Sequence, residues 1–374
     1  MSTSPKKTSG LAGVVAGSTD ICTVGQTGQG LNYRGYAIEE LAEHATFEET
    51  AYLLLYGKLP NQHELDVYRE RLTSMRSLPQ ALLKILEQLP SHAHPMDVLR
   101  TGCSALGCME PEEDFGQQHD IADRLLAALP AILLYWYHFH NSGKRIECET
   151  PANSLAAHFL HLYHGHPPSS LHARVFDVSL TLYAEHEFNA STFAARVAAS
   201  TLSDFYSAVT SAIGTLRGPL HGGANEAAME LILNFKRSEE VEPWLNEALA
   251  QKKKIMGFGH RVYKTADPRN AIIKQWSKAL AAECKDSRIY PVSEAIEDYM
   301  WSRKKLFPNL DFYSASAYYF MGIPIALYTP IFVCSRITGW AAHIFEQRGH
   351  NALIRPSAEY TGPEPREFLS MDLR

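Results

Sequence analysis

Hydrophobic residues at helical spacing recur along almost the whole chain, and this pattern limits the molecule to a mainly helical fold. Thr46 and Glu49 have the spacing of a capping box, and Gly57 and Pro60 are helix stop signals. A second helix is predicted from Asn61, with apolar side chains at intervals of three and four residues. Further helices are predicted over Ala152–Tyr163, Val175–Glu185, Ser191–Leu216, Glu226–Phe235, Trp244–Gln251, Ala271–Glu283, Val292–Lys305 and Ala326–Gln347. The sequence therefore predicts an all-α protein.

One stretch has the character of β-strands rather than of a helix. Residues 23–38, TVGQTGQGLNYRGYAI, place Gly-rich turns between short β-prone pieces, a pattern typical of a β-hairpin. The sequence has no internal repeats and no flexible linker. A second domain would therefore pack against the first domain or be inserted into it, rather than be tethered to it.

The charge balance excludes a general nucleic-acid-binding protein. The 374 residues include 35 basic and 41 acidic side chains, for a net charge of −6, so an anionic ligand must meet a locally basic site. The six cysteines include no C-x-x-C pair, and we expect reduced thiols in a cytosolic protein. The first ten residues carry no targeting signal, so we expect a cytoplasmic location.

An uncharged run of 24 residues, Phe312–Ser335, is long enough to span a bilayer. Pro324 and Pro330 interrupt it, and serine and threonine side chains lower its hydrophobicity. We therefore interpret the run as the buried interior of a large soluble protein, without membrane association. The shorter run Leu125–Tyr137, which Pro130 interrupts, receives the same interpretation.

Three histidines lie in distinctive surroundings. His221 precedes two glycines and a predicted helix, His260 follows glycines in GFGHRVYKTADPR, and His186 lies in YAEHEFNAST between two predicted helices. Glycines let the backbone approach a ligand closely, and a helix N-terminus favours anions and disfavours a protonated imidazole. A lone histidine in a helical protein is more commonly a packed or surface residue. The pattern alone leaves both interpretations open.

Asp311, in FPNLDFYSA, is an isolated carboxylate at the start of the uncharged run. Aspartate is a good helix N-cap, which gives this residue a purely structural interpretation. A carboxylate forced against apolar walls would instead have a raised pKa and would serve as a general base. The local sequence favours neither interpretation.

Basic residues are concentrated between Gln251 and Arg269, where six positive charges accompany one aspartate. The segment is either a solvated loop or a site for phosphates. Arg336 and Arg355 lie in apolar surroundings, where an unpaired arginine is rare. Their planar, bidentate guanidinium groups suit a dicarboxylate or a tricarboxylate.

The common cofactor motifs are missing. GFGH does not fit a dinucleotide-binding fingerprint, and the sequence has neither a Walker A motif nor H-E-x-x-H. A histidine-rich tract could supply zinc ligands but contains neither cysteine nor acidic ligands, so we interpret its members as surface histidines. They are His158, His161, His164, His166 and His172.

Taken together and in order, the segments HEFNAST, PLHGGANE, GFGHRVYKTADPR, PNLDFYSA, SRITGWAAHIFEQR and IRPSAEYTGP resemble the citrate synthase family. The resemblance starts at LNYRGYAIEELA and covers nearly the whole chain. Within the family, HEFNASTF, ILLYWYH, MWSRKKLFPNLDFYSA and GWAAHIFEQR are more similar to the 2-methylcitrate synthase branch than to ordinary citrate synthases.

This resemblance implies a homodimer of chains that each have a large and a small helical domain. The small domain would span residues 222–325 and be inserted into a large domain made of residues 1–221 and 326–374. The implied reaction joins the α-carbon of propionyl-CoA to the ketone of oxaloacetate, and thioester hydrolysis then releases 2-methylcitrate and CoA, as in propionate catabolism through the methylcitrate cycle. Neither a metal nor a redox cofactor is expected.

The resemblance also implies roles for the candidate residues. Asp311 would remove the α-proton, neutral His221 would hydrogen-bond the enolate oxygen, and His260 would polarise the ketone and protonate the alkoxide. Oxaloacetate would be held by His186, Arg269, Arg336 and Arg355, the last of these from the partner subunit. CoA would be bound by Lys252, Lys253, Lys254, Ile255, Met256, Gly257, Phe258 and Gly259.

The acyl preference is less well determined than the chemistry, because one methylene group in a pocket is worth only ~1–3 kcal/mol. Acetyl-CoA is expected to be a slower substrate, and an ordinary citrate synthase is the alternative. Phe188 and Tyr313 lie beside the catalytic motifs and are predicted to shape the acyl pocket. A histidine-rich metalloprotein and a non-catalytic helical scaffold are the alternatives from other classes.

Overall fold

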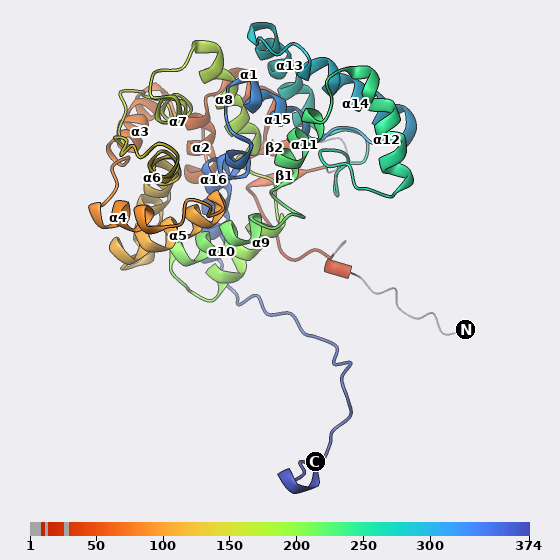
Figure 1. Ribbon diagram of the computed structural model, residues 1–374. Coiled ribbons are helices and arrows are strands. Elements are labelled where there is room, and N and C mark those ends of the chain that lie inside the picture. Colours follow the sequence, from red (N-terminus) through yellow and green to blue (C-terminus); the bar gives the residue numbers. More distant parts are fainter. Residues whose placement is uncertain (1–8, 12–13, 26–29) are drawn as a thin grey trace.

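The computed structural model describes residues 9–11, 14–25 and 30–374, and within these ranges the chain is mainly helical (Figure 1). The α-helices are α1 (Ile38–His44), α2 (Phe47–Tyr56), α3 (Gln62–Ser74), α4 (Gln80–Gln88), α5 (Pro95–Met109), α6 (Gln118–Ser142), α7 (Leu155–His164), α8 (Ser170–Tyr183), α9 (Ala190–Ser200), α10 (Phe205–Leu216), α11 (Ala224–Leu233), α12 (Val241–Ala250), α13 (Pro268–Glu283), α14 (Ile289–Lys304), α15 (Leu310–Phe320) and α16 (Tyr328–Gly349). Short 3₁₀ turns are η1 (Ser9–Leu11), η2 (Phe115–Gln117), η3 (Ser238–Glu240), η4 (Ile325–Leu327) and η5 (Met371–Leu373). The predicted all-α class is confirmed.

The helix boundaries follow the capping signals closely. Thr46 and Glu49 form a reciprocal capping box at the start of α2, and Asn61 and Glu64 form a second one at the start of α3. The α2 helix ends at Gly57, which adopts a left-handed φ of 81°. The other predicted helices are also present, with ends that differ by a few residues, apart from one long segment.

The prediction of one continuous helix over Ser191–Leu216 is wrong. The chain forms α9 and α10 with a break at residues 201–204, where Leu202 has a φ of 64°. Asp204 then caps α10 by accepting a hydrogen bond from the Ser207 N–H at 2.9 Å. The break lets α10 return along α9 as an antiparallel neighbour, which places the start of α9 beside the site described below.

The predicted hairpin is confirmed in its described parts. Strands β1 (Cys22–Val24), β2 (Leu31–Tyr33) and β3 (Tyr36–Ala37) form a small antiparallel sheet in which Cys22 pairs with Tyr33. The predicted Gly-rich turn at residues 26–29 lies outside the described residues. The sheet is important for the site because the Tyr33 hydroxyl reaches the segment that follows α8.

Helix α16 runs through the centre of the larger group of helices and packs against α2, α6, α8 and α9 (Figure 1). Nearly all of its residues from Tyr328 to Ile344 are buried. The uncharged run Phe312–Ser335 is divided between α15 and α16 and lies in this interior, as predicted. Among the described residues, no helix combines the length and apolar character that a bilayer span requires.

Helices α11 to α15 form a second group on one side of the molecule (Figure 1). In this group α13 and α11 pack against α15, and α12 packs against α14. The predicted insertion of a small domain, residues 222–325, into a large domain stays a prediction. Residues 351 and 354 bond to Ser200 at the end of α9, and from residue 355 the chain extends away from both groups (Figure 1).

Candidate active site

The segment between α8 and α9, residues 184–189, is the centre of the candidate site. The Tyr33 hydroxyl donates to the Glu185 carbonyl at 3.0 Å and also accepts from the Glu185 N–H. Glu187 adopts a φ of 53°, a costly conformation for a residue with a side chain. These contacts fix the backbone on both sides of His186. Its buried side chain faces the site, with Nε2 3.1 Å from the Tyr263 hydroxyl. Burial and the surrounding cationic groups lower the pKa of His186 well below its usual value.

His221 is held in a single neutral tautomer. Its Nε2 accepts a hydrogen bond from the Ser191 N–H at the start of α9, at 3.2 Å, and a backbone N–H can only donate. The proton of the ring therefore lies on Nδ1. Burial, with a smaller contribution from the positive charge of Arg336, lowers the pKa of His221 to about 4. The Nδ1–H is thus a neutral hydrogen-bond donor.

Gly222, the glycine after His221, lies where the loop packs closely against two helices. A Cβ on Gly222 would lie 2.3 Å from the Leu216 carbonyl oxygen and 2.8 Å from the Thr329 side chain. The glycine therefore lets the loop pack closely against the end of α10 and the start of α16.

His260 has the opposite tautomer. Its Nδ1 accepts hydrogen bonds from the backbone N–H groups of Val262 at 3.1 Å and Tyr263 at 3.3 Å, so the proton lies on Nε2. Burial, followed by the charge of Arg269, lowers the pKa of His260 to about 4. The ring meets His186 edge to face, with 5.0 Å between centroids. His260 is therefore a second neutral donor beside His186.

Asp311 is not the N-cap of α15. Asn309 caps the helix and accepts a hydrogen bond from the Asp311 N–H at 3.1 Å, which leaves the Asp311 carboxylate free for other contacts. The Tyr183 hydroxyl donates to Asp311 Oδ1 at 2.6 Å. Burial raises the pKa of Asp311 above its usual value, and the Tyr183 hydrogen bond opposes that shift. The residue has the properties of a general base.

Arg336, on α16, is a buried guanidinium group without a carboxylate partner among the described residues. Its Nε donates to the Tyr183 carbonyl at 2.7 Å, and its Cζ lies 4.6 Å from the centre of the Phe332 ring. The same ring contacts Tyr183, at 4.5 Å between centroids, and His221, at 6.4 Å. Phe332 therefore places the arginine close to both the base and the neutral donor.

Arg269 is also buried, but it already has a partner. Its Nε and Nη2 donate to the two Asp267 oxygens at 3.0 and 2.8 Å, which leaves Nη1 for a ligand. Asp267 Oδ2 also accepts from the Leu310 N–H at 3.1 Å. Asp267 thus orients Arg269 and joins the start of α13 to the start of α15.

The predicted CoA-binding segment, residues 252–259, lies beside the Asp311 helix. Lys252, Lys253 and Lys254 are exposed. Asn309 holds the segment with two hydrogen bonds of 2.9 Å, from its N–H to the Gly257 carbonyl and from Nδ2 to the Gly259 carbonyl. Gly257 has a φ of 84°, and a Cβ there would lie 3.1 Å from Phe312. The lysines and the Asp311 carboxylate are therefore parts of one local structure.

The structure does not bring three of the predicted residues to this cluster. Arg355 is exposed on the C-terminal segment that extends away from the helices (Figure 1), so its predicted delivery to a partner's site stays a prediction. Tyr313 lies on the other face of α15, where its hydroxyl donates to Glu297. Phe188 packs against Arg196 and His343. The prediction that Tyr313 shapes the acyl pocket is not supported by this placement.

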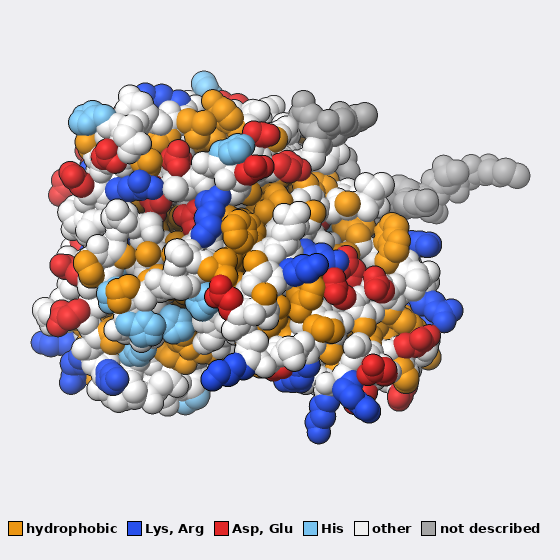
Figure 2. Space-filling view, turned by 90° about the horizontal axis from the view of Figure 1, so that it is seen from above, with side chains coloured by type: hydrophobic (Ala, Val, Ile, Leu, Met, Phe, Trp, Pro, Cys, Tyr) orange, Lys and Arg blue, Asp and Glu red, His pale blue; other side chains and the backbone are white. Residues whose placement is uncertain are grey.

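The histidine-rich tract is not uniformly a surface feature. His158 is fully buried, with Nδ1 3.0 Å from the Thr150 hydroxyl, so the interpretation as a surface histidine is wrong for this residue. Within the described ranges, no three His, Cys, Asp or Glu side chains are grouped as metal ligands. On the face in Figure 2, Lys and Arg side chains are interspersed with Asp and Glu.

Sequence reasoning missed three residues that set the chemistry of the cluster. They are Tyr183, which bonds the base, Ser191, whose N–H fixes the His221 tautomer, and Asp267, which orients Arg269. Asp267 precedes Pro268 at a helix start, a capping signal that marked it in the sequence. Tyr183 and Ser191 act across 128 and 30 residues, so no local pattern could indicate them.

The family model described as "Citrate synthase, C-terminal domain" matches residues 10–357. The chain is 61% identical to a 2-methylcitrate synthase from Shewanella oneidensis, with 96% of each chain covered. It is 43% identical to Citrate synthase 2 from Bacillus subtilis, over 98% of this chain and 99% of that one.

A solved structure of citrate synthase from Thermoplasma acidophilum, in ternary complex with carboxymethyl coenzyme A and oxaloacetate, has a similar fold. The TM-score is 0.91, with 35% sequence identity and 98% of each chain covered. The match to the family model and the relatives of 61% and 43% identity extend over nearly the whole chain. The chain therefore belongs to the citrate synthase family.

Proposed function

We propose that this protein is a 2-methylcitrate synthase, which condenses propionyl-CoA with oxaloacetate and water to give 2-methylcitrate and CoA. The observation that carries this proposal is the high identity to the Shewanella 2-methylcitrate synthase along nearly the whole chain. The cluster of one buried carboxylate, two neutral histidine donors and two buried arginines supplies the groups that this chemistry needs.

The first step is formation of an enolate. Asp311 removes a proton from the α-carbon of the thioester, while the His221 Nδ1–H donates to the developing enolate oxygen. A preorganised donor of this kind contributes typically ~3–4 kcal/mol in a site that excludes water. His221 must be neutral for this task, and its lowered pKa keeps it so at pH 7.

The second step forms the carbon–carbon bond. The enolate carbon attacks the ketone carbon of oxaloacetate, and the His260 Nε2–H donates to the ketone oxygen and then protonates the alkoxide. His186, Arg269 and Arg336 bind the ketone and the carboxylates of oxaloacetate. Water then attacks the thioester carbonyl and the C–S bond breaks. Of the three protons held by this water and by Asp311, one goes to the CoA sulfur, one restores His260 to its neutral form, and one is released to solvent as the new carboxylate forms.

The remaining assignments concern assembly and CoA. Lysines 252–254 and the backbone to residue 259 would bind the phosphates and the pantetheine arm of CoA. Arg355 would complete the oxaloacetate site of a second copy in a homodimer, which fits its position on an extended segment. No resident cofactor takes part in the scheme, and the expected setting is propionate catabolism in the cytoplasm.

The decisive experiment compares kcat/KM for propionyl-CoA and acetyl-CoA, with saturating oxaloacetate and thiol-reagent detection of CoA. A higher value for propionyl-CoA is expected, with acetyl-CoA slower by about tenfold, since one methylene changes binding by only ~1–3 kcal/mol. A clear acetyl-CoA preference would keep the residue roles and identify an ordinary citrate synthase. Absence of CoA release with both thioesters would overturn the proposal.

A further inference from the structure

Residues along one face of α16 contact successive residues of the segment that carries His186. Arg336 donates from Nε to the Tyr183 carbonyl at 2.7 Å, and three residues later the Gly339 N–H donates to the Ala184 carbonyl at 3.1 Å. Positions three and seven residues apart lie on one side of a helix. The next residue on this face, His343, contacts the side chain of the residue that precedes His186.

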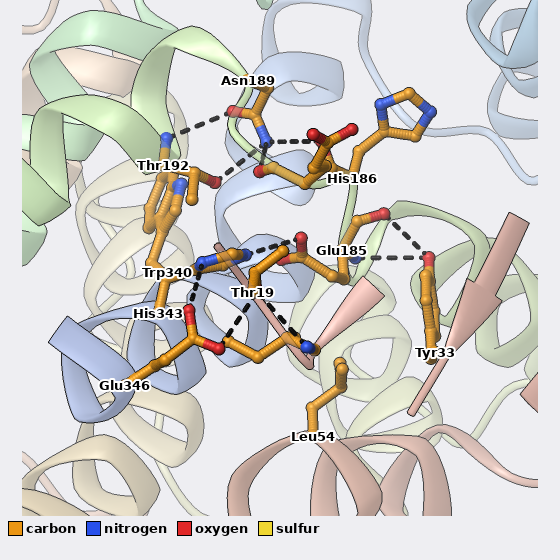
Figure 3. A network of polar contacts seen from close by, with 12 residues as sticks. Thr19, Tyr33, Leu54, Glu185, His186, Asn189, Thr192, Trp340, His343 and Glu346 are labelled. Carbon is orange, nitrogen blue, oxygen red and sulfur yellow. Dashed lines mark hydrogen bonds and ion pairs between the residues drawn. The ribbon is translucent and has the colours of Figure 1, made fainter. Parts of the chain in front are cut away.

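That contact is between His343 and Glu185, and both side chains are 0% exposed. Arg196 Nη1 donates to His343 Nδ1 at 3.0 Å, and an arginine can only donate, so Nδ1 carries no proton. The proton of the ring therefore lies on Nε2, which donates to Glu185 Oε1 at 2.9 Å. Figure 3 shows this chain of contacts from Glu346 through His343 to Glu185, beside the backbone of His186.

The Glu185 carboxylate depends on this histidine. Its other oxygen, Oε2, is buried and has no hydrogen-bond partner among the described residues. A buried carboxylate that loses its donors pays the full desolvation penalty of the group. Without the His343 N–H, the side chain would have to move toward water, and the backbone of residues 184–186 would move with it.

The charges of Glu185 and Arg336 also indicate that the position of the Glu185 carboxylate is important for the site. The negative charge of Glu185 opposes the effect of burial on Arg336, which has no ion-pair partner among the described residues. A Glu185 carboxylate fixed in this place therefore stabilises the charged guanidinium of Arg336 before any anionic ligand arrives. His343 controls the position of this counter-charge, because it provides the hydrogen bond that holds the carboxylate.

We propose that His343 is a positioning residue for oxaloacetate: through Glu185 it holds His186 and Arg336 in the geometry that receives the ketone and carboxylates of the substrate. The proposal rests on the proposed function. Because His343 touches no reacting atom, its substitution is expected to weaken oxaloacetate binding more than it lowers the turnover of bound substrate.

The experiment uses three full-length variants and the wild type. His343→Gln keeps an N–H donor at the reach of Nε2, whereas His343→Asn is too short to reach Glu185. His158→Asn is the matched control, because His158 is another fully buried histidine that bonds a neighbouring side chain away from the site. The measurements are oxaloacetate Kd by calorimetry, KM and kcat for both substrates, and the unfolding temperature.

We expect His343→Asn to raise the Kd and KM for oxaloacetate by about tenfold, with kcat changed by less than about threefold. His343→Gln is expected to restore the Kd to within about threefold of the wild type. His158→Asn should lower the unfolding temperature without changing the Kd. Equal Kd values for the Gln and Asn variants, or a Kd change in His158→Asn that matches its loss of stability, would overturn the positioning role. A wild type without turnover overturns the proposed function itself, and is seen before any variant is measured.

Discussion

The two halves of the site are held in very different ways. The buried half, made of residues 183–191 and α16, includes the buried side chains of Tyr183, Glu185, His186, Arg336 and His343, each hydrogen-bonded to another residue of the protein. The loop half, made of residues 252–264, presents exposed lysines and a partly exposed His260, with Lys252 in a left-handed conformation. One half is fixed by contacts within the protein, and the other keeps charged side chains exposed to solvent.

This difference matches the chemistry that each half is proposed to perform. Fixed charges and donors in a buried site act on a small, rigid dianion without reorganisation. A long acyl-CoA needs an open surface on which phosphates and the pantetheine arm can lie. Asn309 and Asp311 connect the two halves. Asn309 holds the loop half and caps the helix of Asp311, and Tyr183 of the buried half donates to Asp311.

The largest effect is expected at the point where the halves meet. Asp311→Asn removes the base and should lower kcat by about 10²–10⁴-fold. Steady-state CoA release measures the loss, and thermal unfolding serves as the control, since the amide keeps the size of the side chain. Wild-type turnover in this variant would show that another group removes the proton.

The next largest effect tests the buried half. Arg336→Met removes a buried guanidinium group that is proposed to donate hydrogen bonds to oxaloacetate. The KM for oxaloacetate should therefore rise by about 10- to 100-fold. The KM for acyl-CoA should change by less than about threefold. Equal increases in both KM values would contradict the division of the site into two halves.

A smaller effect concerns the hydrogen bond to the base. Tyr183→Phe removes a donor that stabilises the Asp311 carboxylate, so the pKa of Asp311 should rise further. The protonated form then persists to higher pH, and the acid limb of the kcat/KM profile for acyl-CoA should move to higher pH. The loss at neutral pH is expected to be about tenfold. An unmoved acid limb would mean that Asp311 does not set it.

The smallest effect is expected in the loop half. Replacing Lys252, Lys253 and Lys254 together by Gln should raise the KM for acyl-CoA by about three- to tenfold, because exposed charges are screened by solvent. The wild-type KM should rise with salt, and that dependence should weaken in the variant. A salt dependence equal to that of the wild type would place the CoA phosphates elsewhere.

The sequence identified most side chains of the site but not the way they are held. The glycines made His221 and His260 candidates, and apolar surroundings made Arg336 one, while the resemblance to the citrate synthase family assigned roles to these residues and to His186. The tautomer of each histidine depends on backbone donors that the fold brings together, and no local pattern contains that information. The prediction that Phe188 and Tyr313 shape the acyl pocket rests on proximity in sequence alone, and proximity does not show where a side chain packs.

The break between α9 and α10 was missed for a related reason. Leu202 turns the chain with a positive φ, and a leucine in the sequence gives no indication of that conformation. Asp204 is an ordinary N-cap, but the apolar spacing on both sides continues as if one helix ran through. Tertiary packing of α10 against α9 overrides the local periodicity there.

Gly339 restricts how the protein can change in evolution. A single methyl group on its Cα would lie 2.2 Å from Glu185 Oε2 and 2.5 Å from the Ala184 carbonyl oxygen. Substitutions at this contact cannot proceed by small steps, because the smallest addition already collides with the segment that carries His186. The three exposed lysines, residues 252–254, have no such barrier, so their side chains can change by single substitutions while this contact stays as it is.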